Sequence, residues 1–117
     1  MLSFHNDDYW TFTVEFDFPD EREDYIKMLF EADSPVEQIF VGTGEKNDVF
    51  VVQGVISFYE KVNRKYAEKH VRSKNVYPIS EGSVKNQENA ITKEFKNIRQ
   101  IRTYRMPEII KFKPKIN

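Results

Sequence analysis

The stretch DVFVVQGVISFY, from Asp48 to Tyr59, decides the fold of this 117-residue chain because it leaves no polar face. A strand that covers a core with one side alternates apolar and polar residues, whereas this run carries apolar side chains at both odd and even positions. We therefore predict a strand with both of its faces covered.

The segments on either side of this strand follow strand and helix spacing. Apolar residues alternate between Tyr9 and Asp17, as in a half-buried strand, and recur at helical spacing from Tyr25 to Phe30. The expected strands are 9–17, 36–42, 48–59 and 76–79, with a turn over 42–48. We expect three helices, which begin at caps on Asp20, Asn63 and Ser83. The last of them should run toward Ile98. This β-α-β-β-α-β-α order predicts an α+β fold, a ferredoxin-like sandwich with a central antiparallel sheet and helices packed mainly on one side.

Length and composition indicate one small domain. We expect a single domain over residues 1–104, followed by a basic tail over 105–117. The absence of cysteine excludes a disulfide framework and gives no zinc site. The residues after Met1 lack the pattern of a signal peptide, and no apolar run is long enough to span a bilayer. We expect an intracellular protein, in the cytoplasm or nucleus of a host cell, with no membrane partner.

The net charge of −1 hides two halves of opposite sign. Residues 1–50 hold thirteen acidic and three basic side chains, whereas residues 51–117 hold six acidic and fifteen basic ones. Basic side chains with aromatic residues between them are suited to a phosphate backbone and its bases, so nucleic acid is the expected partner. The residues predicted to contact phosphate are Lys61, Arg64, Lys65, Lys69, Arg99, Arg102 and Arg105. The alternative is that the two halves neutralise each other, within one fold or between subunits.

Three segments occur in the order and at the spacing of a known family. They are Trp10–Phe16, Val51–Gly54 and a segment that opens with Glu81-Gly82-Ser83 and ends at Glu94. Together they resemble the motifs of the HUH endonuclease domain in Rep proteins, the rolling-circle replication initiators of circoviruses, nanoviruses and alphasatellites. The resemblance covers roughly residues 9–95 and implies the fold of a nicking domain.

The chain departs from these motifs at the residues that carry out catalysis in the family. The resemblance implies that Val51 replaces the family's metal-binding histidine and Ala90 its nucleophilic tyrosine, while Gln53 and Lys93 remain as a vestigial site. Valine has no lone pair for a metal and alanine has no nucleophilic oxygen, so nicking cannot run through these positions. We therefore expect a degenerate site without catalysis and without a cofactor.

A rebuilt metal site is the remaining route to an enzyme. Glu15 and Asp17 share one face of the first strand with Thr13, and Glu45 is among the positions where the resemblance places a metal-binding glutamate. Their oxygens are suited to Mg²⁺ or Mn²⁺. The simpler explanation of Glu15 and Asp17 is a solvated strand face.

The lost histidine leaves a valine-rich face, defined by Val49, Val51 and Val55, on the expected working side of the sheet. Such a face needs a cover, from Met106–Ile110, from a second copy of the chain or from another protein. The first function that fits is a catalytically inactive Rep-like domain that binds nucleic acid, DNA before RNA, and regulates replication or competes with an active initiator. The second is a protein-interaction module of viral or mobile-element origin that uses the valine-rich face. The third is a metal-dependent DNA-nicking enzyme.

Overall fold

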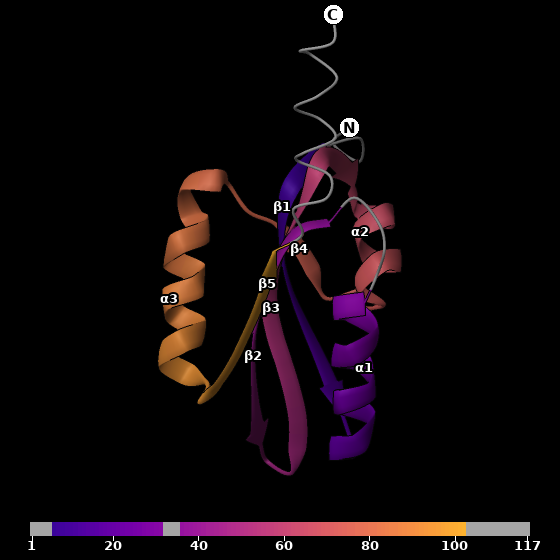
Figure 1. Cartoon of the computed structure of the whole chain (residues 1–117), viewed down its shortest axis with the longest axis vertical. Helices are drawn as coiled ribbons and strands as arrows, with labels where there is room; N and C mark the ends of the chain where they lie inside the picture. The colour runs from indigo at the N-terminus through magenta and orange to yellow at the C-terminus, as the bar shows by residue number, and fades with distance from the viewer. Residues whose placement is uncertain (1–5, 32–35, 103–117) are drawn as a thin grey trace, which may run out of the picture.

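A computed structural model describes residues 6–31 and 36–102 and shows an α+β protein built on one antiparallel sheet (Figure 1). The strands of the described chain lie in the order β4-β1-β3-β2-β5. The elements are β1 (Asn6–Phe16), α1 (Pro19–Glu31), β2 (Val36–Lys46), β3 (Val49–Asn63), α2 (Arg64–Val71), β4 (Val76–Pro78), the 3-10 turn η2 (Glu81–Ser83), α3 (Val84–Glu94) and β5 (Asn97–Arg102). This arrangement is compatible with a ferredoxin-like type of fold. None of the described helices has the length and apolar character needed to cross a membrane.

The apolar run of residues 49–59 lies on β3, which is the central strand of the sheet. It pairs antiparallel with β1, from Asn6↔Asn63 to Phe16↔Phe50, and with β2 along its other edge. Val52, on one face of the strand, is 0% exposed, and Val55, on the other face, is 2% exposed. The prediction that both faces are covered is confirmed.

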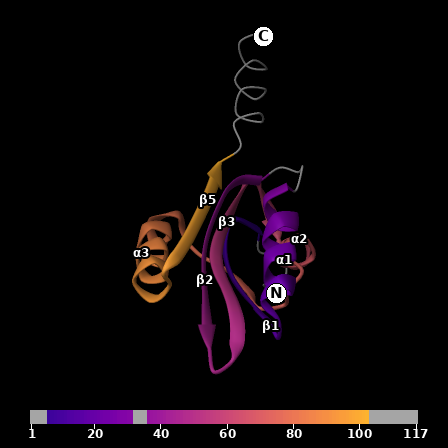
Figure 2. The same ribbon diagram turned by 60° about the horizontal axis from the view of Figure 1, so that its bottom comes forward.

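Helices cover both faces of the sheet. α1 and α2 pack on one face, over a core that includes Trp10 and Ile56. α3 lies on the opposite face (Figure 2). There Ile91 and the adjoining Phe95 pack with Val55. The prediction that helices lie mainly on one side therefore holds for α1 and α2, and α3 is the exception.

The hairpin between β2 and β3 turns later than predicted. Its turn residues are Asn47 and Asp48, whose φ angles of 52° and 66° fit a two-residue turn of the primed type. Gly42 and Gly44, which the sequence suggested as turn residues, lie inside β2. A Cβ atom on Gly42 would lie 2.5 Å from Cγ2 of Ile91, so the glycine allows α3 to approach the sheet closely.

A strand replaces the predicted end of the last helix. α3 ends at Glu94, and Phe95 takes up extended backbone angles (φ −114°, ψ 141°). β5 follows and pairs with β2 from Thr43↔Asn97 to Gln38↔Arg102. The predicted basic tail, residues 105–117, lies outside the described residues.

The three predicted helix caps have different outcomes. Asn63 caps α2 as predicted, because its side-chain oxygen accepts a hydrogen bond from the Tyr66 backbone N–H at 2.8 Å. Ser83 precedes α3 but makes no side-chain capping bond. Asp20 lies within α1, which begins at Pro19, a residue suited to the first helical position because it has no N–H to leave unsatisfied.

Candidate functional site

The segments that resemble Rep motifs lie on β1, on β3 and over η2 and α3, and part of each strand segment faces α3. Glu15, Val51 and Gly44 are directly opposite one another across β1, β3 and β2. Two residues before Glu15 on β1, Thr13 lies opposite Gln53. Directly opposite residues share a face, so the common face predicted for Thr13 and Glu15 is confirmed and also includes Gln53, whereas Asp17 lies beyond the end of β1.

Apolar packing fills the position of Val51, which the resemblance aligns with the metal-binding histidine of the Rep family. Val51 is 5% exposed and Val55 is 2% exposed, and both belong to one cluster with Ile91 and Phe95. The prediction that the valine-rich face needs the tail, a second copy or another protein as its cover is wrong, because α3 covers it. The segment proposed as an internal lid, Met106–Ile110, lies outside the described residues.

The positions of the family's tyrosine and lysine lie on the outer side of α3. Ala90 and Lys93 are exposed, whereas Ile91 between them is 1% exposed. Val51 brings no ligand atom and Ala90 no nucleophile. The geometry therefore supports no phosphodiester cleavage at these positions.

The candidate metal ligands are not gathered into one set. Glu15 and Asp17 are exposed, and Glu15 lies on the α3 face opposite Val51. Glu45 pairs with Phe50, which is the neighbour of Val51 along β3, so the alternation of side chains places Glu45 on the other face. Among residues 6–31 and 36–102, no group of three or more acidic, histidine or cysteine side chains is placed to hold a metal.

A basic surface surrounds α2. The segment 61–74 contains six basic side chains and one acidic one. We call the five of these that are exposed and make no ion pair within the described chain the α2 basic surface: Lys61, Lys65, Lys69, Arg72 and Lys74. Like charges at this density repel one another, so the surface is suited to an anionic partner.

The sixth cation of this segment, Arg64, is committed to the fold. Its Nε lies 3.5 Å from a carboxylate oxygen of Glu68, and its Nη2 donates a hydrogen bond to the carbonyl of Val76. Its guanidinium also lies 4.8 Å from the ring centroid of Tyr77 on β4. These three contacts leave Arg64 less available to phosphate than its sequence position suggests.

The other predicted phosphate-binding arginines lie away from α2. Arg99 on β5 pairs with Glu23 of the acidic α1 helix, at 2.9 Å. This pair is one instance of the alternative in which the acidic and basic halves neutralise each other. The side chain of Arg102 and the whole of Arg105 lie outside the described residues.

An aromatic hollow adjoins the α2 basic surface. Its volume is about 500 Å³, and we call it the α1–α2 hollow; its walls are Met28, Tyr66, Lys69, His70 and Arg72. The rings of Tyr66 and His70 are nearly parallel, with an interplanar angle of 9° and centroids 6.3 Å apart. His70 is four residues from Tyr66 on a helix, a spacing at which two side chains meet, so the sequence carried a signal for this ring pair.

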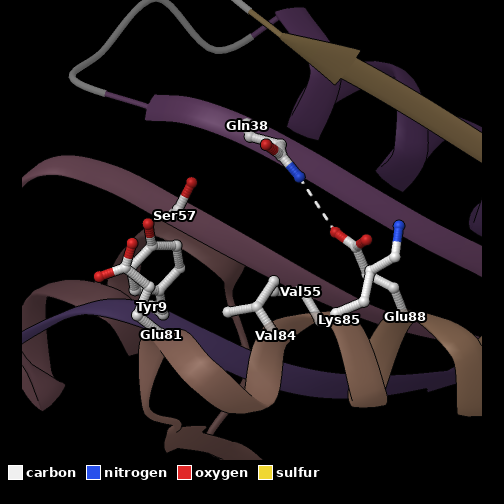
Figure 3. A pocket seen from close by; sticks show the side chains of 8 residues that line it. All are labelled: Tyr9, Gln38, Val55, Ser57, Glu81, Val84, Lys85 and Glu88. Carbon is white, nitrogen blue, oxygen red and sulfur yellow. Dashed lines mark hydrogen bonds between the residues drawn. The ribbon is translucent and has the colours of Figure 1, made fainter.

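A second, more polar groove lies between α3 and the sheet (Figure 3). It has a volume of about 300 Å³, and Tyr9 and Ser57 line one end of it. Gln38 donates a hydrogen bond to Glu88 at 3.0 Å across the other end. Burial, reinforced by nearby carboxylates that include Glu81, raises the pKa of Tyr9 above its ordinary value of 10.0.

Comparison with known proteins assigns no family. No protein-family model matches the chain, and no curated protein is significantly similar to it.

Proposed function

We propose that the chain is a catalytically inactive Rep-like domain that binds nucleic acid, DNA before RNA, through the α2 basic surface. The observation that carries this proposal is the set of five exposed cations between Lys61 and Lys74 that make no ion pair within the described chain. In the cell such a domain would regulate replication or compete with an active initiator. Its partner would place it in the cytoplasm or nucleus of a host cell.

The physical argument is the release of counterions. A cation that already faces a carboxylate, as Arg99 faces Glu23, gains little from a phosphate. A cation without such a partner can neutralise a phosphate and release the counterion condensed there. If all five cations of the α2 basic surface contact phosphate, the logarithm of affinity should fall with the logarithm of salt concentration at a slope of about −3.5 to −4.5.

Two further observations support the Rep-like and inactive parts of the proposal. The three resembling segments lie on β1, on β3 and over η2 and α3, so they occupy adjoining elements around one face of the sheet. At the positions where the resemblance expects a ligand and a nucleophile, the chain has a buried Val51 and an exposed Ala90. The proposal therefore separates binding from cleavage.

The test is a fluorescence-anisotropy titration of labelled oligonucleotides with two matched charge variants. One variant replaces four lysines of the α2 basic surface, Lys61, Lys65, Lys69 and Lys74, by Gln. The control replaces four exposed lysines elsewhere, Lys27, Lys85, Lys93 and Lys96, by Gln, so both variants have the same net charge.

We expect the α2 variant to lose at least tenfold in affinity. The slope of log affinity against log salt concentration should become less steep by about one for each replaced lysine that contacts phosphate. The control should bind within about threefold of the wild type, because its lost charges act only at long range. Equal losses in the two variants would contradict the proposal. So would the absence of wild-type binding at low salt.

A further inference from the structure

The α1–α2 hollow presents a ring that the fold holds in place while leaving it accessible. Tyr66 is 38% exposed, yet its ring packs edge-on against the buried Phe58, at 5.7 Å between centroids. His70 packs against the same Phe58 at 5.5 Å. Because Phe58 fixes both rings from beneath, a flat ligand that stacks on them finds them already ordered.

The second ring of the hollow is suited to stacking without adding charge. Burial lowers the pKa of His70, so the imidazole is neutral at neutral pH. The positive charge of the hollow therefore comes from Lys69 and Arg72, which stand at its wall. The hollow combines aromatic faces with cations, and its volume of about 500 Å³ is within the range of sites that take small molecules.

A neighbouring depression offers a place for a phosphate. Its volume is about 440 Å³, and it shares Lys69 and Arg72 with the hollow. Lys65 and Lys74 stand at its other walls. The one acidic residue of the depression, Glu68, is paired with Arg64, which offsets its charge.

We infer that the α1–α2 hollow accepts one unpaired nucleobase while Lys65, Arg72 and Lys74 bind the adjoining phosphates, so that the chain prefers single strands. This inference rests on the proposed function and adds the form of the ligand. A base in a duplex is stacked on both sides and must leave the stack to enter the hollow, whereas a base in a single strand is free to do so.

The test separates stacking from charge by comparing two probes. The first is a short oligothymidylate, and the second is an abasic oligonucleotide of the same length, which keeps the phosphates and has no bases. Tyr66→Ala should bind the oligothymidylate at least fivefold more weakly than the wild type does. It should bind the abasic probe with the same affinity as the wild type.

Two variants control for structure. Tyr66→Phe keeps the ring and should bind within about twofold of the wild type. Phe18→Ala removes another exposed ring, 63% accessible at the start of α1 and remote in sequence from α2, and should also leave the affinity unchanged. Loss of affinity in Tyr66→Phe equal to that in Tyr66→Ala would overturn the stacking role of Tyr66.

The remaining outcomes distinguish the two levels of the proposal. If the wild type binds both probes, and a duplex of the same length, with equal affinity, the inference is overturned while binding through charge stands. If neither probe binds at low salt, the proposed function fails and the inference falls with it.

Discussion

The two sides of the sheet differ in whether stability alone explains the residues found there. On the α3 face, the position that the resemblance gives to a metal ligand is filled by Val51, packed with Ile91 and Phe95. On the other face, the α2 basic surface carries five exposed cations that make no ion pair within the described chain. Apolar packing is sufficiently explained by stability, whereas repelling charges on a surface are not. The side that looks least like a Rep active site is therefore the better guide to a partner.

The largest expected effect tests whether the α3 face is held by packing. Phe95→Ala should lower the free energy of unfolding by about 3–5 kcal/mol, because it removes a ring that is 6% exposed. Phe18→Ala, at a ring that is 63% exposed, should change it by less than about 0.5 kcal/mol. Urea unfolding measures both. A loss of less than about 1 kcal/mol in Phe95→Ala would show that the face is loosely packed.

Putting the missing chemistry back should sharpen the contrast between the faces. The double variant Val51→His and Ala90→Tyr should show no Mn²⁺-dependent nicking of single-stranded DNA, since the imidazole would enter the space packed by Ile91 and Phe95. It should also lose about 2–4 kcal/mol of stability through overpacking and the burial of a polar ring. Measured nicking by this variant would refute the argument that packing has closed the site.

A smaller loss is expected where a glycine admits α3. In Gly42→Ala the new methyl carbon would meet Cγ2 of Ile91 at 2.5 Å and Cβ of Phe95 at 2.8 Å, so we expect a loss of about 1–3 kcal/mol. Gly82→Ala is the matched control, because no heavy atom lies within 4 Å of its new methyl carbon. Thermal or urea unfolding of both variants checks this. Similar stabilities would argue against close packing of α3.

Replacing a paired cation should affect stability more than binding, and replacing an unpaired cation should affect binding more than stability. Arg99→Gln breaks an exposed ion pair with Glu23 and should cost about 0.2–1 kcal/mol of stability with little change in oligonucleotide affinity. Lys69→Gln should leave stability within about 0.5 kcal/mol and should weaken binding. Unfolding and anisotropy measurements on both variants give the four values. A reversed pattern would move the binding surface toward β5.

The smallest effect concerns pH. Burial lowers the pKa of His70 below its ordinary 6.5, so the unfolded chain takes up this proton more readily than the folded protein. This contribution to the free energy of unfolding is therefore full above pH 6.5 and falls as the pH drops toward the lowered pKa. The variant His70→Phe should lose this part of the pH dependence in urea unfolding. An unchanged pH profile would mean that the ring is solvated.

Local patterns in the sequence were enough for much of the fold. The apolar run of β3 identified a strand with both faces covered, and Asn63 was identified as a cap because capping depends on residues close in sequence. β5 was missed because the last helix was predicted to run toward Ile98, and because the pairing of β5 with β2 is a long-range property. Gly42 and Gly44 were taken for turn residues because the close approach of Phe95 cannot be read locally.

The candidate site was predictable to a similar extent. The cations of the α2 basic surface lie within one 14-residue segment, and charge alone was enough to single out Lys61, Lys65 and Lys69 among them. The α1–α2 hollow was not, because Met28 comes from another helix. Arg99 was assigned to phosphate because its partner, Glu23, lies 76 residues earlier in the chain. Side-chain pairing across elements is the information that composition lacks.

The most direct test of the central claim is amide chemical-shift mapping of the labelled protein during titration with a short oligothymidylate. We predict shifts that cluster in residues 61–74, with residues 84–95 of the α3 region largely unaffected. Shifts concentrated on α3 and around Val51, or no shifts at low salt, would contradict the assignment of binding to the α2 side of the sheet.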